Sequence, residues 1–138
     1  MKIVISPDSF KEWKPSKEIG DIMKSAIEEF CEVNKIKQPQ FSVVPIGDGG
    51  EGTIDAIFNA IGGKYVECAN VVDPLGRRIQ SEYLSLVDGS KTAFIEIARA
   101  SGLYLIEPEK RNPLITTSYG VGQLILDAYN SGNKRIIV

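Results

Sequence analysis

The hydrophobic pattern of this chain changes near residue 70, and each half predicts a different kind of sheet. Before that point, strand-like apolar runs alternate with helical repeats, in the order 3–5, 16–33, 41–46 and 53–61. This alternation indicates parallel strands, because a parallel connection needs a crossover segment, usually a helix. After that point, short turns join three strand-like segments: residues 65–72, 79–87 and 91–97. Short turns between strands indicate an antiparallel meander.

The first helix has the clearest periodicity in the chain. Its apolar side chains recur at intervals of three and four residues and form one continuous face: Ile19, Ile22, Met23, Ala26, Ile27 and Phe30. Such a face is expected to be buried against a sheet. Ser16 is the expected N-cap, and Glu18 lies in the first turn, where the helix dipole favours an acid. A later helix is expected over residues 117–130.

These patterns predict an α/β fold in two parts. A parallel α/β portion is expected over residues 1–70, and part of a second α/β domain containing the meander over residues 71–138. The last residues, Ile136 to Val138, form an apolar run of the kind that begins a core strand. We therefore expect that 138 residues is not the natural length of the protein.

Composition excludes several classes of function. His is absent, which excludes histidine catalysis and imidazole metal ligands within this chain. Cys31 and Cys68 are too few for a disulfide framework or a cysteine-rich zinc site. The chain has 16 Lys and Arg against 18 Asp and Glu, which gives a net charge of −2. Because no excess of positive charge is available for phosphate groups, we expect no nucleic-acid or membrane partner. The absence of a signal-peptide pattern and of a membrane-length apolar run predicts a cytoplasmic protein.

A glycine-rich loop lies between the second strand and second helix. Gly47, Gly49 and Gly52 match G-x-G-x-x-G in the context that a dinucleotide site requires. Asp48 and Glu51, however, would repel a pyrophosphate. The two carboxylates suit Mg²⁺, or the orientation of a substrate hydroxyl. A purely structural turn, with acids favoured at a helix N-terminus, fits the same residues.

The loop after the first strand carries a second set of polar side chains: Asp8, Ser9 and Lys11. Ligands of open parallel sheets bind beyond the carboxyl ends of the strands. If the first two strands are neighbours, this loop and the glycine-rich loop face one crevice. An acid, a hydroxyl and a lysine beside a pair of acids suit phosphate and metal chemistry. The alternative is a solvated loop, and Trp13 is expected to serve packing.

A third polar segment lies between two prolines. Arg111 offers a fork of donors for a carboxylate or phosphate, and Asn112 follows it. Thr116 and Thr117 then precede the last helix, where hydroxyl groups either cap the helix or bind an anion. From chemistry alone, ordinary capping and a surface charge are the favoured explanation of these residues.

Six segments together give a more specific indication than any one of them. They are IVISPDSFKE (3–12), PIGDGGEGT (45–53), DPLG (73–76), ASGL (100–103), EKRNPL (109–114) and TTSYGVGQLI (116–125). In this order and spacing the chain resembles the bacterial glycerate kinase family. Three positions depart from the commonest form: Gly47 replaces Ala, Asp73 precedes Pro-Leu-Gly, and Ser118 replaces Thr. Each departure leaves the candidate functional groups in place.

The resemblance implies an ATP-dependent kinase that phosphorylates D-glycerate, with the 2-hydroxyl as the expected acceptor. It implies two α/β domains, one of them Rossmann-like, with the active site in the cleft between them. Members of the family are considerably longer and continue into a Gly-Gly-Ser-Ala-Thr-Asn-Asp-Gly-Gly type segment. We therefore expect this chain to be an N-terminal fragment without kinase activity of its own.

The resemblance and the loops together predict the site. Asp8, Lys11, Asp48 and Glu51 are the expected catalytic residues, and Asp48 and Glu51 the expected Mg²⁺ ligands. Substrate and nucleotide contacts are expected from Ser9, Gly49, Gly50, Arg111, Asn112, Thr116 and Thr117. ATP and Mg²⁺ are the expected cofactors, D-glycerate is the expected substrate, and exposed sheet edges favour a homo-oligomer. Two alternatives stay open: a Rossmann-like nucleotide- or dinucleotide-binding module without kinase activity, and a non-catalytic folded partner.

Overall fold

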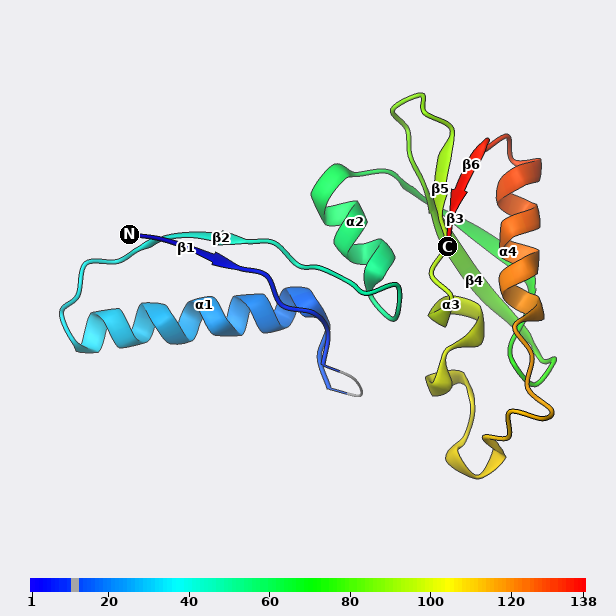
Figure 1. Cartoon of the computed structure of the whole chain (residues 1–138), viewed down its shortest axis with the longest axis horizontal. Helices are drawn as coiled ribbons and strands as arrows, with labels where there is room; N and C mark the ends of the chain where they lie inside the picture. Colours follow the sequence, from blue (N-terminus) through cyan, green and yellow to red (C-terminus); the bar gives the residue numbers. More distant parts are fainter. Residues whose placement is uncertain (11–12) are drawn as a thin grey trace.

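The computed structural model describes residues 1–10 and 13–138, and it contains two sheets (Figure 1). Strands β1 (Lys2–Ile5) and β2 (Gln40–Val43) pair in parallel. The second sheet has the order β3-β4-β5-β6, from β3 (Lys64–Val72), β4 (Arg78–Ser85), β5 (Thr92–Phe94) and β6 (Arg135–Ile137). The predicted mixed α/β class and the antiparallel β3-β4-β5 meander are confirmed. Strand β6 adds to the meander in parallel to β5.

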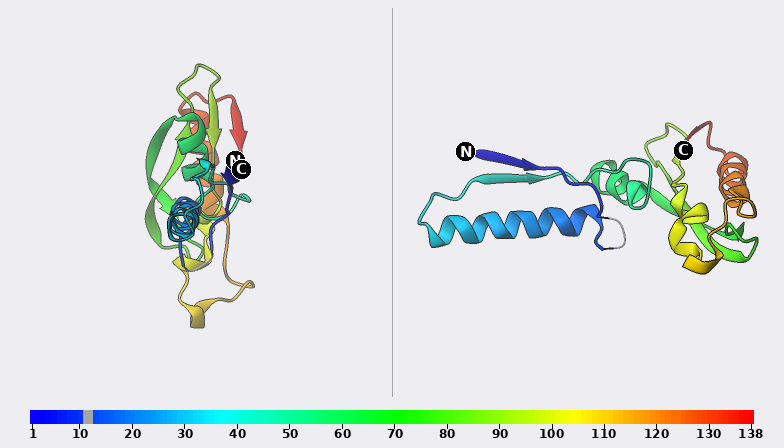
Figure 2. Two further views of the ribbon diagram at one scale, coloured as in Figure 1. Left: turned by 90° about the vertical axis from the view of Figure 1, so that its left-hand side faces the viewer. Right: turned by 60° about the horizontal axis from the view of Figure 1, so that its bottom comes forward.

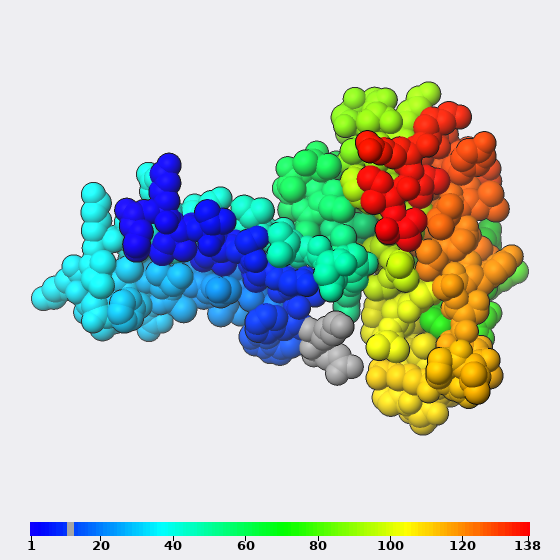
Figure 3. Space-filling view, in the orientation of Figure 1, coloured from blue at the N-terminus to red at the C-terminus, as the bar shows by residue number. Residues whose placement is uncertain are grey.

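Helix α1 (Ser16–Val33) is the crossover between β1 and β2. Its cap position is Pro15, so Ser16 begins the helix and is not its N-cap as predicted. Ile19 is buried, but Phe30, on the same predicted face, is 60% exposed. Strands β1 and β2, of 4 residues each, are too short to cover the 18-residue helix α1 along its whole length. Residues 1–46 extend as an arm from the rest of the molecule (Figure 3).

Helices cover both faces of the four-stranded sheet. Tyr83 lies in the core on the α4 (Tyr119–Asn130) side, where its hydroxyl donates to Asp127 at 3.2 Å. Helix α2 (Thr53–Ile61) lies on the opposite side, where Phe58 packs against Tyr65 with ring centroids 5.0 Å apart. Figure 2 shows α2 between the arm and this sheet. The core cluster consists of Cys68, Val71, Tyr83, Ala93, Ile95, Ala100, Val121, Leu124 and Ala128.

The bounds of several predicted elements differ from those observed. Strand β2 ends at Val43, although the Ile46 amide still donates to the Pro7 carbonyl at 3.2 Å. The predicted strand 91–97 is the short β5, and the chain then enters α3 (Ala98–Ser101), η1 (Leu103–Leu105) and η2 (Pro108–Lys110). Among the described residues, none of the helices is both long and apolar enough to cross a membrane.

The predicted domain boundary at residue 70 falls inside β3, at an irregularity in its pairing with β4 between Cys68 and Val71. Residues on both sides of that irregularity pair with β4, so the change from parallel to antiparallel pairing lies earlier, between β2 and β3. The division into residues 1–70 and 71–138 stays a prediction.

Helix α4 fits closely against the end of β3. A Cβ atom added at Gly120 would collide with the carbonyl oxygen of Val72. The Val72 amide donates to the side-chain oxygen of Gln123 at 2.8 Å. The motif that contains Gly120 and Gln123 therefore has a structural use here, because a larger residue at 120 would force the helix away from the strand.

Candidate functional site

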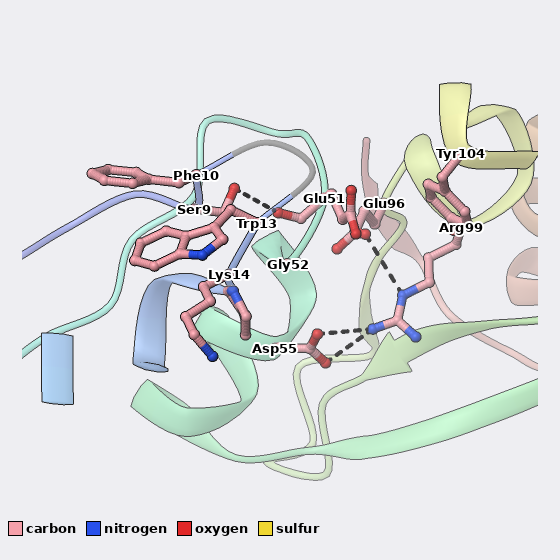
Figure 4. A pocket seen from close by; sticks show the side chains of 11 residues that line it. Ser9, Phe10, Trp13, Lys14, Glu51, Gly52, Asp55, Glu96, Arg99 and Tyr104 are labelled. Atoms are coloured by element: carbon pink, nitrogen blue, oxygen red, sulfur yellow. Dashed lines mark hydrogen bonds and ion pairs between the residues drawn. The ribbon is translucent and has the colours of Figure 1, made fainter. Parts of the chain in front are cut away.

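A cavity of about 440 Å³ lies where segments that follow three strands meet (Figure 4). Ser9 comes from the loop after β1, Glu51 from the loop after β2, and Glu96 and Arg99 from the segment after β5. Tyr104 of η1 also lines it. Carboxyl ends of strands are where open α/β sheets bind their ligands. This cavity is therefore the candidate functional site.

The loops after β1 and β2 meet at this cavity, as their parallel pairing requires. The Ser9 hydroxyl donates to the backbone carbonyl of Glu51 at 3.3 Å, and the Ser9 amide donates to a carboxylate oxygen of Asp8 at 2.7 Å. The expected convergence thus extends to Ser9 and Glu51, while Asp8 lies beside Ser9 and outside the described lining of the cavity. The predicted catalytic residue Lys11 lies outside the described residues.

The glycine-rich loop satisfies two of its own amides. The Gly49 amide donates to the Thr53 hydroxyl at 3.0 Å, and the Gly50 amide donates to the Asp48 carboxylate at 2.9 Å. Gly49 has a φ of +97°, a backbone conformation that favours glycine. Both amides predicted to contact a ligand are thus engaged within the loop, which does not favour a pyrophosphate cradle. Asp48 is exposed and lies outside the described lining of the cavity.

Glu96 is the most deeply buried acid of the cavity, and sequence reasoning missed it. Its side chain is 1% exposed. One carboxylate oxygen accepts a hydrogen bond of 3.1 Å from the Ile54 amide, in the first turn of α2. Burial raises the pKa of Glu96, while hydrogen bonds from the backbone of Ile54 and Gly52, and the charge of Arg99, act against this rise. The available signal was an acid within the apolar run 93–97.

Arg99 joins three carboxylates. Its guanidinium donates to both oxygens of Asp55 at 3.0 Å and to Glu82 at 2.5 Å, and it lies 3.6 Å from Glu96. Asp55 also accepts a hydrogen bond of 2.6 Å from the Tyr65 hydroxyl. Burial lowers the pKa of Arg99, but the surrounding carboxylates raise it by more. Arg99 therefore stays charged and fixes the positions of the acids around it.

Two of the residues that line the cavity carry exposed aromatic rings. Phe10 and Trp13 both line it, with ring centroids 5.8 Å apart. Trp13 was expected to serve packing, yet it is 60% exposed. Trp13 is also the single tryptophan of the sequence, so its fluorescence reports on this cavity alone.

The predicted group around Arg111 lies outside the described lining of this cavity. The Arg111 guanidinium donates to the carbonyl oxygens of Ile106 at 3.2 Å and Leu103 at 3.3 Å. Its neighbours have local partners too. Asn112 accepts from the Leu114 amide at 3.0 Å, the Thr116 amide donates to the Asn112 carbonyl at 3.1 Å, and the Thr117 hydroxyl accepts from the Tyr119 amide at 3.1 Å. The structure thus brings together the first two loops but not this segment.

Comparison with known proteins gives a consistent result. The sequence model of the glycerate kinase family matches residues 3–138. The glycerate kinase of Haemophilus influenzae is 43% identical over 139 residues, covering 100% of this chain and 35% of the relative. The glycerate 2-kinase of Escherichia coli K12 is 44% identical over 138 residues, covering 100% of this chain and 34% of the relative.

A solved structure shares the fold as well. A protein from Salmonella typhimurium LT2, assigned as glycerate kinase 2, superposes with a TM-score of 0.67 at 39% identity, covering 99% of this chain and 34% of that protein. The chain therefore spans about a third of the length of the relatives that it matches. With the family's sequence pattern present over residues 3–138, the chain belongs to the glycerate kinase family.

Proposed function

We propose that this chain forms part of a glycerate kinase, which transfers a phosphoryl group from ATP to the 2-hydroxyl of D-glycerate. The observation that carries the proposal is the acid-lined cavity at the strand ends of a chain from this family. The name of the Escherichia coli relative supports the choice of the 2-hydroxyl. Because the chain covers about a third of its relatives, the activity is assigned to the longer protein.

Phosphoryl transfer depends mainly on positioning and on neutralising charge. Glu51 has an exposed side chain that lines the cavity, so we assign it to orient the acceptor hydroxyl and accept its proton. Ser9 and Asp8 lie on the adjoining loop and are assigned to substrate contacts. Lys11 is assigned to the transferred phosphoryl group on chemical grounds alone.

Asp48 fits the way in which Mg²⁺ is bound, while Glu51, the second predicted ligand, is assigned to the acceptor hydroxyl instead. Mg²⁺ is commonly held by one or two carboxylates, with phosphate oxygens and water completing its shell. Asp48 uses one carboxylate oxygen for the Gly50 amide and keeps the other available. Within residues 1–10 and 13–138, no group of three or more acidic or cysteine side chains could hold a metal ion. Bound Mg²⁺ would neutralise phosphate charge here.

The remaining assignments require a change in hydrogen bonding. Gly49, Gly50, Arg111, Asn112 and Thr117 would have to exchange their present hydrogen bonds for ligand contacts. Thr116 is half-buried in the same segment as Arg111. The contacts of these residues with nucleotide or glycerate, a cytoplasmic location and self-association all stay predictions.

The test measures glycerate-dependent ATP consumption by a protein that carries this chain at the full length of its relatives. We expect Asp48→Asn to lower turnover by at least a hundredfold, in line with the loss of a group that stabilises developing charge. Asp88→Asn is the matched control, because Asp88 accepts from the Ser90 amide at 2.9 Å in the same kind of turn, away from the described lining of the cavity. Wild-type turnover in Asp48→Asn would overturn its assignment.

The dinucleotide-binding alternative is tested with the 138-residue chain. MgATP or D-glycerate should change the fluorescence of Trp13, while NAD should not. A response to NAD alone would favour the alternative. We expect this chain by itself to consume no ATP.

A further inference from the structure

Helix α2 begins at a glycine that has no side chain with which to cap it. Gly52 occupies the cap position with a φ of 89°, and Thr53 is the first helical residue. The amides of the first turn of a helix need acceptors from outside the helix. For Ile54, that acceptor is the carboxylate of Glu96, 42 residues further along the chain. The start of α2 is therefore held by a residue of the segment that follows β5 in the four-stranded sheet.

This contact also fixes the glycine-rich loop relative to the four-stranded sheet. Glu51 immediately precedes the cap residue Gly52, so the position of its side chain in the cavity follows the position of the first turn of α2. Glu96 follows β5 by two residues and is therefore set by the sheet. The hydrogen bond between Glu96 and the Ile54 amide connects these two elements directly at the cavity wall.

Arg99 forms a second link between the segment after β5 and the first turn of α2. Its Nε lies 3.6 Å from one oxygen of Glu96, and its Nη2 donates to Asp55 on the first turn of α2. Glu96 and Asp55 thus share one cation, and helix α2 is attached to the α3 segment at two points. Burying a carboxylate without such partners would lower the stability of the fold. The contacts with Arg99 and the Ile54 amide compensate for the burial of Glu96.

We propose, as an extension of the glycerate kinase assignment, that Glu96 is a positioning residue: its carboxylate holds the first turn of α2 and thereby sets where Glu51 meets the acceptor hydroxyl. Glu96 acts through α2. The length of the Glu96 side chain matters more for this role than its charge, because the Ile54 amide needs a hydrogen-bond acceptor at a defined position.

The test compares three substitutions in the full-length protein. Glu96→Asp keeps the charge but shortens the side chain by one methylene, and we expect it to lower kcat about a hundredfold with little change in KM. Glu96→Gln keeps the length and an acceptor oxygen, and its kcat should stay within tenfold of wild type. Asn133→Ala is the matched control, because Asn133 is buried and donates to the Ala128 carbonyl at the end of α4. It should lower the melting temperature without lowering kcat.

Three outcomes contradict the proposal. Wild-type kcat in Glu96→Asp would show that the reach of the side chain is unimportant. A Glu96→Gln enzyme as impaired as Glu96→Asp would show that the charge acts directly. A matching loss of kcat in Asn133→Ala would show that general destabilisation explains the effect.

Amide hydrogen exchange separates this proposal from the proposed function. The Ile54 amide should exchange faster in Glu96→Asp than in wild type, and at the wild-type rate in Glu96→Gln. If the wild-type protein consumes no ATP with glycerate, the kinase assignment fails, and the exchange rates alone decide whether Glu96 holds α2. Unchanged exchange in Glu96→Asp overturns the positioning role, whatever the activity.

Discussion

Residues 1–46 and residues 64–138 are built from the same kinds of element, yet they pack very differently. In the first region one long helix lies on two strands, and Val4, Ile22 and Phe30 stay exposed. In the second region α4 covers one face of four strands, α2 from the preceding segment covers the other, and a contiguous core forms. An apolar helical face is thus buried only as far as the sheet beside it extends.

The ion pairs of the two regions differ in the same way. In residues 13–33, Lys14 with Glu18 and Lys17 with Asp21 are pairs one helical turn apart, on the surface of one helix. In the second region Arg77 connects the β3–β4 turn to Glu107, thirty residues away in sequence. Pairs of the first kind contribute little to stability, while pairs of the second kind hold separate segments together.

The largest expected effect is in the core of the second region. Leu124→Ala should lower the free energy of unfolding by about 2–5 kcal/mol, because Leu124 is fully buried and the substitution leaves a cavity. Leu126→Ala, on the same helix but 59% exposed, is the matched control and should change it by less than about 1 kcal/mol. Urea unfolding followed by circular dichroism measures both.

Ile22→Ala extends this prediction to the arm. Ile22 is 46% exposed, so its loss should cost much less than that of Leu124. Equal costs for Ile22→Ala and Leu124→Ala would break the comparison between the regions, because α1 would then be as firmly packed as α4.

A smaller effect is expected where α4 touches β3. Gly120→Ala should cost about 1–3 kcal/mol, because the added Cβ collides with the Val72 carbonyl. Gly122→Ala is the matched control on the same helix. Its Cβ would point into open space, so the alanine should stabilise by about 0.5–1 kcal/mol through its helix propensity. Two changes of the same sign, measured by thermal unfolding, would contradict the close approach.

The smallest effect concerns acid stability. The Glu107 backbone amide and the side chains of Lys110 and Arg77 lower the pKa of Glu107 from 4.5 to about 2. Because the folded state depresses this pKa, its contribution is complete above pH 4.5 and disappears as the pH falls towards about 2. Glu107→Gln should therefore lose less stability across this interval than wild type.

Glu18→Gln tests the same point in the arm. Glu18 pairs with Lys14 on the surface of α1, so its removal should lower the melting temperature near neutral pH only slightly. The measurement is the melting temperature as a function of pH. A larger change in Glu18→Gln than in Glu107→Gln would reverse the contrast between local and long-range pairs.

Local periodicity predicted most of the fold because it reports which face of an element is apolar. The predicted helix over residues 53–61 coincides with α2, and both pairing modes were correct. Periodicity does not report how many strands lie beside a helix, so the exposure of Phe30 was not foreseen. The predicted division of the chain at residue 70, which falls inside β3, stays a prediction.

Sequence patterns predicted the part of the candidate site that depends on neighbouring strands, but not the part that depends on contacts between distant residues. Asp8, Ser9 and Glu51 follow neighbouring parallel strands, and adjacency along a sheet can be inferred from alternation. Glu96 and Arg99 depend on partners more than forty residues away, such as Ile54 and Asp55, and nothing in the local sequence specifies that distance. Arg111 has the chemistry of a ligand-binding residue, but the backbone carbonyls of its own segment occupy its donors.

The contact between Gln123 and the Val72 amide also affects how the sheet meets other strands. Strand β3 is the first in the order β3-β4-β5-β6, and its outer side would ordinarily offer backbone donors to a passing strand. Gln123 occupies one of these donors, and the irregularity between Cys68 and Val71 interrupts the regular spacing of the rest. Near its C-terminal end, β3 therefore offers a less regular template for strand addition than an uninterrupted edge would.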